Sequence, residues 1–218
     1  MKNLQKTGAF AAIYMALAYL IGIAIFLVVL DYPSMTDTMQ KVILLIQQQG
    51  MIFLTNILMY VLFGLALVVF ALALQNRVKE KAPALAQVAT IIALIWAGLL
   101  IASGMVSNAG IQPVIALYET DPAQAALLWN TYETIASGLG NGNGEILGGV
   151  WTLLISLAAL KGTSYPKALS YLGLLIGSIG ILSVVPGMAD LAGLFGLSQV
   201  IWFVWWGINM FRHKEQIP

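Results

Sequence analysis

Long apolar runs separated by short polar stretches dominate the chain. Five runs contain no Asp, Glu, Lys or Arg: residues 8–30, 51–74, 84–106, 168–187 and 191–211. The hydrocarbon core of a bilayer is about 30 Å thick, and a helix needs about 20 apolar residues to cross it. Each of these five runs is therefore predicted to be a membrane-spanning helix.

A sixth uncharged run, residues 146–160, is too short to cross a bilayer by itself. It reaches a full crossing only if the helix begins near Gly138 and carries Glu145 in its outer turn, which predicts a span over residues 138–160. The fold expected is thus all-α, an integral membrane six-helix bundle, with residues 1–218 forming a single transmembrane domain.

The two longer polar segments, residues 31–50 and 107–145, are predicted to carry extracytoplasmic amphipathic helices. Ser34 and Asp37 stand at the spacing of a capping box, and apolar residues at helical intervals follow, so this helix is expected to run into the second span. Asp121 followed by Pro122 predicts the start of the other helix. Residues 138–145 alternate glycine with larger residues, which is typical of a hinge loop.

Charge supports this arrangement. Only 9% of the residues are charged, against about 25% in soluble domains. With six spans and a cytoplasmic N-terminus, nine of the ten basic residues fall on the cytoplasmic side, as the positive-inside rule requires, and Lys41 alone does not. Most acidic residues fall on the other side. Both termini are therefore predicted to be cytoplasmic, and no nucleic-acid partner is expected.

Composition also restricts the chemistry. The chain has no cysteine and one histidine, His213, so thiolate metal sites, iron–sulfur clusters and two-histidine haem cannot form within it. The sequence motifs of zinc proteases, nucleophile-elbow hydrolases and nucleotide-binding loops are absent as well. We therefore expect no cofactor, no metal and no catalytic residue of these types. An enzyme that uses carboxylates alone stays open, although a non-enzymatic role is preferred.

Small residues and tryptophans in the last two predicted spans have structural interpretations. Gly173 and Gly177 stand at GxxxG spacing, which favours close helix packing within the chain over a homo-oligomer interface. Trp202, Trp205 and Trp206 are expected to pack in the core or, for the last two, to belong to an interfacial aromatic belt. Both readings are preferred to a ligand-stacking site.

Five polar residues are candidates for a ligand site on the outer side: Glu145, Asn141, Asn143, Asn56 and Gln199. An ionisable residue near a span is costly and therefore a functional hypothesis. Glu145 would accept a cation or a proton, and the amides would orient the ligand. The competing interpretation makes Glu145 an interfacial carboxylate at a helix N-terminus, and makes Asn56 and Gln199 hydrogen-bonding links between helices.

Four short stretches are similar to a known family. They are residues 4–8 (LQKTG), 148–154 (GGVWTLL), 165–173 (YPKALSYLG) and 201–207 (IWFVWWG). In this order they resemble the bacterial multi-spanning membrane proteins of domain-of-unknown-function family 4386. The resemblance implies a protein of the bacterial inner (cell) membrane, and it transfers no activity and no site residue.

Three functions follow as hypotheses. The first is a multi-pass inner-membrane protein that binds a small or lipid-like ligand from the outer side, as carrier or sensor, with membrane lipids around it. The second is a structural or interaction protein that docks a partner through its outer helices. The third is an intramembrane enzyme that depends on two outer carboxylates meeting in one cleft.

Overall fold

The computed structural model describes residues 2–140, 145–162 and 165–212, and over these ranges the chain forms helices and turns without a strand. The all-α prediction is confirmed. The elements in chain order are α1 (Lys2–Ile23), η1 (Ala24–Val29), η2 (Tyr32–Ser34), α2 (Thr38–Asn56), η3 (Ile57–Leu62), α3 (Phe63–Val78), α4 (Pro83–Tyr118), α5 (Pro122–Leu139), α6 (Glu145–Leu160), α7 (Lys167–Leu182) and α8 (Leu191–Arg212).

Four continuous helical stretches are long and apolar enough to cross a membrane: Asn3–Val29, Thr38–Val78, Pro83–Tyr118 and Leu191–Arg212. They indicate a membrane protein. α6 and α7 are equally apolar but have only 16 residues each. At 1.5 Å per residue each is about 24 Å long, at the short end of what crosses a bilayer.

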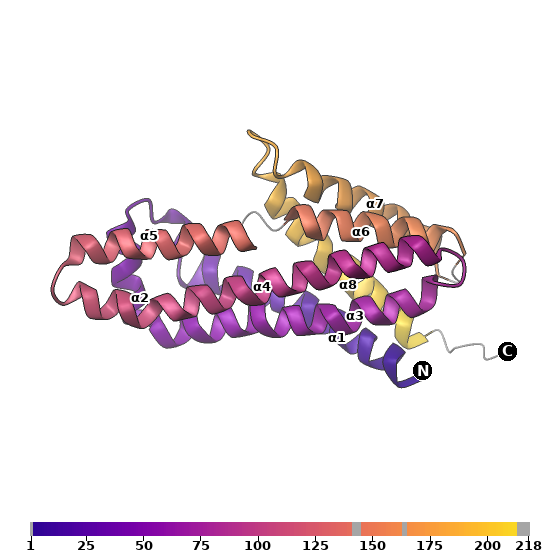
Figure 1. The fold of residues 1–218 in the computed structure, drawn as a ribbon, viewed down its shortest axis with the longest axis horizontal. Coiled ribbons are helices and arrows are strands. Elements are labelled where there is room, and N and C mark those ends of the chain that lie inside the picture. Colours follow the sequence, from indigo (N-terminus) through magenta and orange to yellow (C-terminus); the bar gives the residue numbers. More distant parts are fainter. Residues whose placement is uncertain (1, 141–144, 163–164, 213–218) are drawn as a thin grey trace.

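The molecule is elongated and has two parts, which differ in the helices they contain (Figure 1). One part, here called the bundle, packs α1 against α3 and α8, α4 against α3 and α6, and α6 against α7. The other part, here called the cap, consists of η2, α2, α5 and the second half of α4. Because α4 has 36 residues, it is about 54 Å long and belongs to both parts.

Each part has its own apolar core. The cap core lies between α2, α4 and α5 and includes Leu45, Ile111 and Trp129. The bundle core is built around Trp151 and Trp202, whose ring centroids are 5.6 Å apart in an edge-to-face arrangement. These side chains give the bundle a dense aromatic centre, and they lie directly beyond the cavities described below.

The tryptophans of α8 lie mainly in the core of the bundle and not in an interfacial belt. Trp202 and Trp206 are fully buried, and the Trp206 ring lies 4.9 Å from that of Tyr165. Only Trp205 is partly exposed. The belt interpretation of Trp206 is therefore wrong, because the bundle itself buries this side chain.

The glycines of α7 pack against α6 within the chain, as predicted. A Cβ atom on Gly177 would lie 2.7 Å from the carbonyl oxygen of Gly149 and 2.7 Å from the amide nitrogen of Leu153. A Cβ on Gly149 would in turn lie 2.8 Å from the carbonyl oxygen of Gly177. The two backbones are thus in direct contact, which only glycine permits at these positions.

Helix boundaries differ from the predictions in three places. Asp37, not Ser34, caps α2: its carboxylate accepts a hydrogen bond of 3.0 Å from the amide of Met39, and the Ser34 hydroxyl donates to Asp31 instead. The span predicted over 138–160 is two elements, because Gly138 belongs to α5 and α6 begins at Glu145. The segment predicted as outer, 107–145, begins inside α4, which continues to Tyr118. The predicted cap at Asp121 is confirmed, since its carboxylate accepts from the amide of Gln124.

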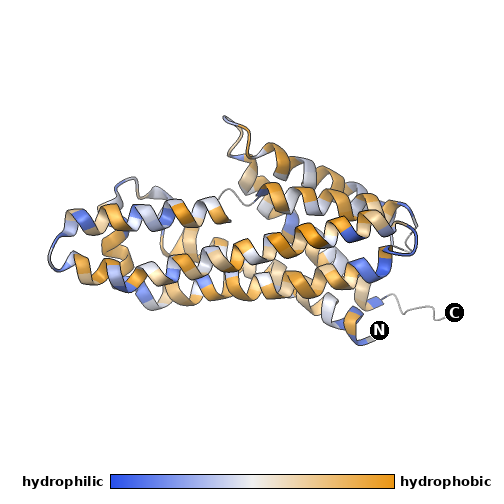
Figure 2. Ribbon diagram, in the orientation of Figure 1, coloured by the Kyte–Doolittle hydropathy of each residue, from blue (hydrophilic) through white to orange (hydrophobic). Residues whose placement is uncertain are grey.

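The basic residues gather at one end of the molecule, which we call the basic end. The start of α1, the α3–α4 turn, the α6–α7 connection and the end of α8 all lie there (Figure 1). These segments carry seven of the described basic residues: Lys6, Arg77, Lys79, Lys81, Lys161, Lys167 and Arg212. Polar colouring marks this end and the far end of the cap, with apolar helices between them (Figure 2).

Candidate functional site

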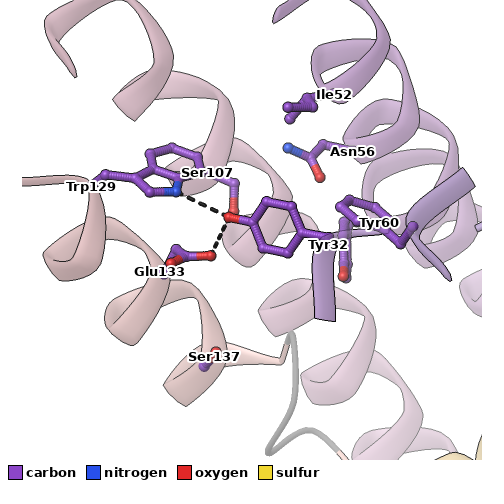
Figure 3. Close-up of a pocket in the computed structure, with 9 residues that line it drawn as sticks. Tyr32, Ile52, Asn56, Tyr60, Ser107, Trp129, Glu133 and Ser137 are labelled. Atoms are coloured by element: carbon purple, nitrogen blue, oxygen red, sulfur yellow. Dashed lines mark hydrogen bonds between the residues drawn. The ribbon is translucent and has the colours of Figure 1, made fainter. Parts of the chain in front are cut away.

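Two neighbouring cavities lie where the cap meets the bundle. The first has a volume of about 280 Å³ (Figure 3), and the second of about 100 Å³. Tyr60 belongs to the wall of both, so the two cavities adjoin at this side chain. The first is lined by Phe26, Tyr32, Ile52, Asn56, Tyr60, Ser107, Trp129, Glu133 and Ser137; the second by Tyr19, Met59, Tyr60, Phe63, Leu100, Gly140 and Glu145.

Both π-helical segments of the described chain contribute to these walls. η1 supplies Phe26 to the first cavity, and η3 supplies Met59 and Tyr60. A π turn inserts an extra residue into a helix, which changes the face that the following side chains present. Such turns frequently occur at functional sites.

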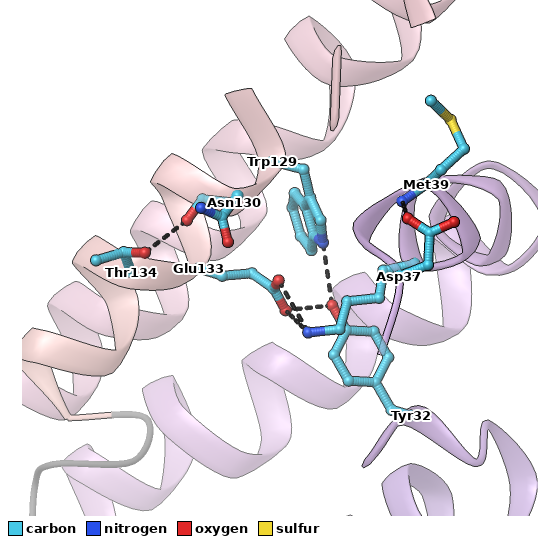
Figure 4. A network of polar contacts seen from close by, with 8 residues as sticks. Tyr32, Asp37, Met39, Trp129, Asn130, Glu133 and Thr134 are labelled. Carbon is cyan, nitrogen blue, oxygen red and sulfur yellow. Dashed lines mark hydrogen bonds and ion pairs between the residues drawn. The ribbon is translucent and has the colours of Figure 1, made fainter. Parts of the chain in front are cut away.

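One wall of the first cavity is a polar network between three segments (Figure 4). The Tyr32 hydroxyl donates to Glu133 Oε1, and Trp129 Nε1 donates to the Tyr32 hydroxyl at 3.0 Å. Lys41 Nζ lies 3.2 Å from Glu133 Oε2 and 4.9 Å from the centroid of the Tyr32 ring. This network ties α2, α5 and the α1–α2 connection together.

The electrostatics of this network keep Tyr32 as the donor. Burial raises the pKa of the Tyr32 hydroxyl above its ordinary value, and the negative charge of Glu133 raises it further. Tyr32 is therefore protonated at neutral pH and can donate to Glu133. The same network accounts for Lys41, the one basic residue that does not follow the charge sorting, because its charge is paired with Glu133.

Glu145 is the carboxylate of the second cavity. Its Oε2 atom is buried and has no hydrogen-bond partner within the described part of the chain. Tyr19, Tyr60 and Phe63 line the same cavity, and no Lys or Arg from the described ranges lines either cavity. A buried ionised carboxylate needs a partner, so this atom is available to one that the described protein does not supply.

The structure brings together only part of the predicted site. Glu145 and Asn56 lie in adjoining cavities. The Asn56 amide also donates to Asn108 Oδ1 at 2.9 Å, which is the helix-linking role considered as its alternative. Gln199 lines neither cavity: it is fully buried and donates to Thr152 Oγ1 at 2.7 Å. Asn141 and Asn143 lie outside the described residues.

The sequence did not point to Tyr32, Lys41 or Trp129 of the polar network as site residues, and Glu133 was considered only as one of the outer carboxylates that an enzyme could pair. Lys41 could have indicated this network. It is the basic residue that falls on the predicted outer side, and a lone cation there implies a nearby carboxylate partner. Glu133 and Glu145 line different cavities, and Lys41 and Tyr32 already engage Glu133, so the two carboxylates do not share a cleft.

Comparison with known proteins gives a single result. Residues 8–210 match the family described as "Domain of unknown function (DUF4386)". No curated protein and no solved structure matches the chain significantly. The match covers nearly the whole chain, and its description names no activity, ligand or partner.

Proposed function

The chain belongs to the DUF4386 family, whose description assigns no activity. We therefore propose a function from the site itself: a multi-pass inner-membrane protein that binds a small or lipid-like ligand in the cap-side cavities, from the outer side of the membrane. The observation that carries the proposal is the pair of cavities at the junction of cap and bundle, with the buried and unpartnered oxygen of Glu145 in one of them.

The orientation in this proposal rests on the two ends of the molecule. The basic end lies in the cytoplasm by the positive-inside rule, so the cap faces outward. Exposed large apolar side chains run from Val88 to Met105 on α4 and from Leu194 to Phe211 on α8. Each band covers about 26 Å of helix, close to the thickness of the hydrocarbon core. In this arrangement α6 and α7 complete six crossings, and the cap projects from the membrane.

Size and lining favour a small ligand that is partly apolar. Ligand cavities have volumes of about 300 to 1,000 Å³ and mostly apolar walls with a few convergent polar groups. The first cavity, at about 280 Å³, is at the lower limit of this range. Its aromatic and aliphatic side chains are joined by Asn56, Ser107 and Glu133, which can orient a polar group.

The packing beyond the second cavity favours a sensor over a carrier. Phe63 lines that cavity, and its ring lies 6.1 Å from Trp96 and 6.2 Å from Phe203. Trp96 in turn lies 5.8 Å from Trp151. These contacts fill the bundle between the cavities and the basic end, so transport would require the aromatic core to open.

The alternative of a docking protein has less support. One of its two motivating features was the GxxxG spacing of α7, and that face is covered by α6 of the same chain. The alternative of a carboxylate enzyme requires two carboxylates in one cleft, whereas Glu133 and Glu145 line separate cavities.

Native mass spectrometry of the full chain in lipid nanodiscs tests the proposal. Wild type should retain a small-molecule adduct, and Ser137→Trp, which fills the first cavity, should lose it. Ser178→Trp is the matched control, because Ser178 is exposed on α7. An adduct that survives Ser137→Trp, or the lack of any adduct in wild type, would contradict the proposal.

A further inference from the structure

The second cavity combines a carboxylate with aromatic rings and has no cation of its own. Glu145 Oε2 is buried without a hydrogen-bond partner among the described residues. All of the described basic residues except Lys41 belong to the basic end, and Lys41 is paired with Glu133. None of the described basic side chains lines this cavity. The Glu145 carboxyl group therefore has no counter-ion from the described chain.

The side chains around this carboxylate include three aromatic rings and a thioether. Tyr19 and Phe63 meet edge to face with ring centroids 5.3 Å apart, and Tyr60 and the thioether of Met59 complete the lining. Aromatic faces attract ammonium groups, above all those whose charge is spread over methyl groups. A carboxylate among such rings is a known way to bind organic cations, because it adds net charge to the attraction of the rings.

The ligand atoms present do not suit a hard metal ion. Calcium takes six to eight oxygen ligands, whereas this cavity offers the carboxylate of Glu145 and the hydroxyls of Tyr19 and Tyr60. No cluster of three or more His, Cys, Asp or Glu exists among the described residues. An organic cation fits this lining better than an inorganic one.

On these grounds, and resting on the outward ligand site proposed above, we propose that the second cavity is the cation subsite, where Glu145 and the rings of Tyr19, Tyr60 and Phe63 hold the ammonium group of a small organic cation. The cavity volume of about 100 Å³ equals the liquid volume of roughly three water molecules. This space suits a small ammonium head group, and the rest of the ligand occupies the first cavity.

Tyr60 is the passage between the two subsites, because it lines both cavities. Its position is set from the neighbouring helix: a Cβ on Gly104 would lie 2.6 Å from the Cβ of Tyr60. The side chain therefore cannot retreat toward α4. Entry of the head group requires a rotation of the Tyr60 side chain within η3, and π-helical backbone is suited to such local adjustment.

The test measures binding of choline to the full chain in nanodiscs by calorimetry, at constant ionic strength. The comparison compound is 3,3-dimethyl-1-butanol, which has the same shape without the charge. Wild type should bind choline at least tenfold more tightly than the neutral compound. Glu145→Gln should weaken choline binding at least tenfold, and should leave the neutral compound unaffected. Glu119→Gln, which changes an exposed carboxylate outside both cavities, should bind as wild type does.

A second pair of variants distinguishes loss of the aromatic face from a general loss of structure. Tyr19→Phe retains the aromatic face and should keep choline affinity within about twofold of wild type, whereas Tyr19→Leu should weaken it at least threefold. Equal affinity for choline and the neutral compound, or an unchanged affinity in Glu145→Gln, would overturn the cation subsite. If choline does not bind but Ser137→Trp still removes a native adduct, this inference fails and the proposed function stands. If neither is seen, both fail.

Discussion

Lys41 illustrates how one residue can depart from a global pattern for a local reason. The positive-inside rule would keep a cation out of this segment, and the structure gives Lys41 a carboxylate, Glu133, and the face of Tyr32. Both side chains of the ion pair are 24% exposed, so the pair is partly screened by solvent. Its main effect is to fix α2 relative to α5.

A double-mutant cycle measures this contact. Lys41→Met and Glu133→Gln should each destabilise the protein, and the cycle should give a coupling energy of about 0.5 to 1 kcal/mol. Equilibrium unfolding in mixed micelles provides the free energies. Pairing Glu133→Gln with Lys161→Met, at the basic end, should give no coupling. A coupling energy of zero between Lys41 and Glu133 as well would show that the ion pair does not stabilise the cap.

Tyr32 predicts a dependence of stability on alkaline pH. In the unfolded chain this hydroxyl ionises near its ordinary pKa of 10.0, and burial beside Glu133 keeps it protonated to higher pH in the folded chain. The unfolded state therefore loses its proton first, and the free energy of unfolding falls as pH rises above about 10, by at most about 1.4 kcal/mol per pH unit. Below pH 9 this contribution is constant.

Unfolding curves at pH 8, 10 and 11 test this expectation. Tyr32→Phe should have a shallower loss of stability between pH 10 and 11 than wild type has. Tyr171→Phe, which changes an exposed tyrosine of α7, should follow wild type. Parallel curves for all three proteins would mean that Tyr32 ionises as freely in the folded state as in the unfolded one.

The orientation of the Gln199 side chain could not be predicted from the sequence. Its depth along the last helix matched that of Asn56, but depth does not give the rotation of a helix about its axis. The structure turns Gln199 toward Thr152 of α6 and turns Asn56 toward the first cavity. The charge of Glu145, in contrast, restricted that residue to the end of a span, so its placement near a cavity could be anticipated.

Gln199→Leu should therefore have a structural effect without a binding effect. Hydrogen bonds between membrane helices contribute about 0.6 kcal/mol on average, and a loss of this size is expected for Gln199→Leu. Thr152→Val removes the hydrogen-bond partner of Gln199. The double variant should therefore be little less stable than Gln199→Leu alone. Choline affinity and adduct retention should equal those of wild type. A binding defect in Gln199→Leu would return this residue to the ligand site.

At the scale of elements, apolar runs predicted the helices well and their ends poorly. The run that ends at Val106 stops because polar residues follow, but α4 continues to Tyr118 since its second half packs into the cap core through Ile111 and Val114. The proposed start of a span near Gly138 was wrong as well. Gly138 belongs to α5 instead, and that helix ends one residue later, at Leu139.

The α6–α7 contact gives a prediction at this scale. Gly177→Ala should destabilise the bundle by about 1 to 3 kcal/mol, because its methyl group would overlap the backbone of Gly149 and Leu153. Gly98→Ala is the matched control within a helix, with open space at the Cβ position, and should be neutral or stabilising by about 0.5 to 1 kcal/mol. Thermal unfolding in detergent compares the two, and equal stabilities would contradict the close packing.

The molecule is asymmetric along its long axis. One end carries the basic residues and both described chain ends, and the other carries the cap with its own core (Figure 1). The two cavities lie between these parts. A ligand that enters from the cap side would contact α2, α4, α5 and η1 at once, which could alter how the cap sits on the bundle. Such a change is what the proposed sensor role requires.

The proposed function requires both cavities to open on the outer side of the membrane. Cysteine labelling can locate them, because the chain contains no cysteine of its own. Ser137→Cys in the first cavity and Thr120→Cys in the α4–α5 turn should react with a membrane-impermeant maleimide added to intact cells. Lys161→Cys at the basic end should react only after the membrane is permeabilised. Labelling of Ser137→Cys and Lys161→Cys from the same side would contradict the account.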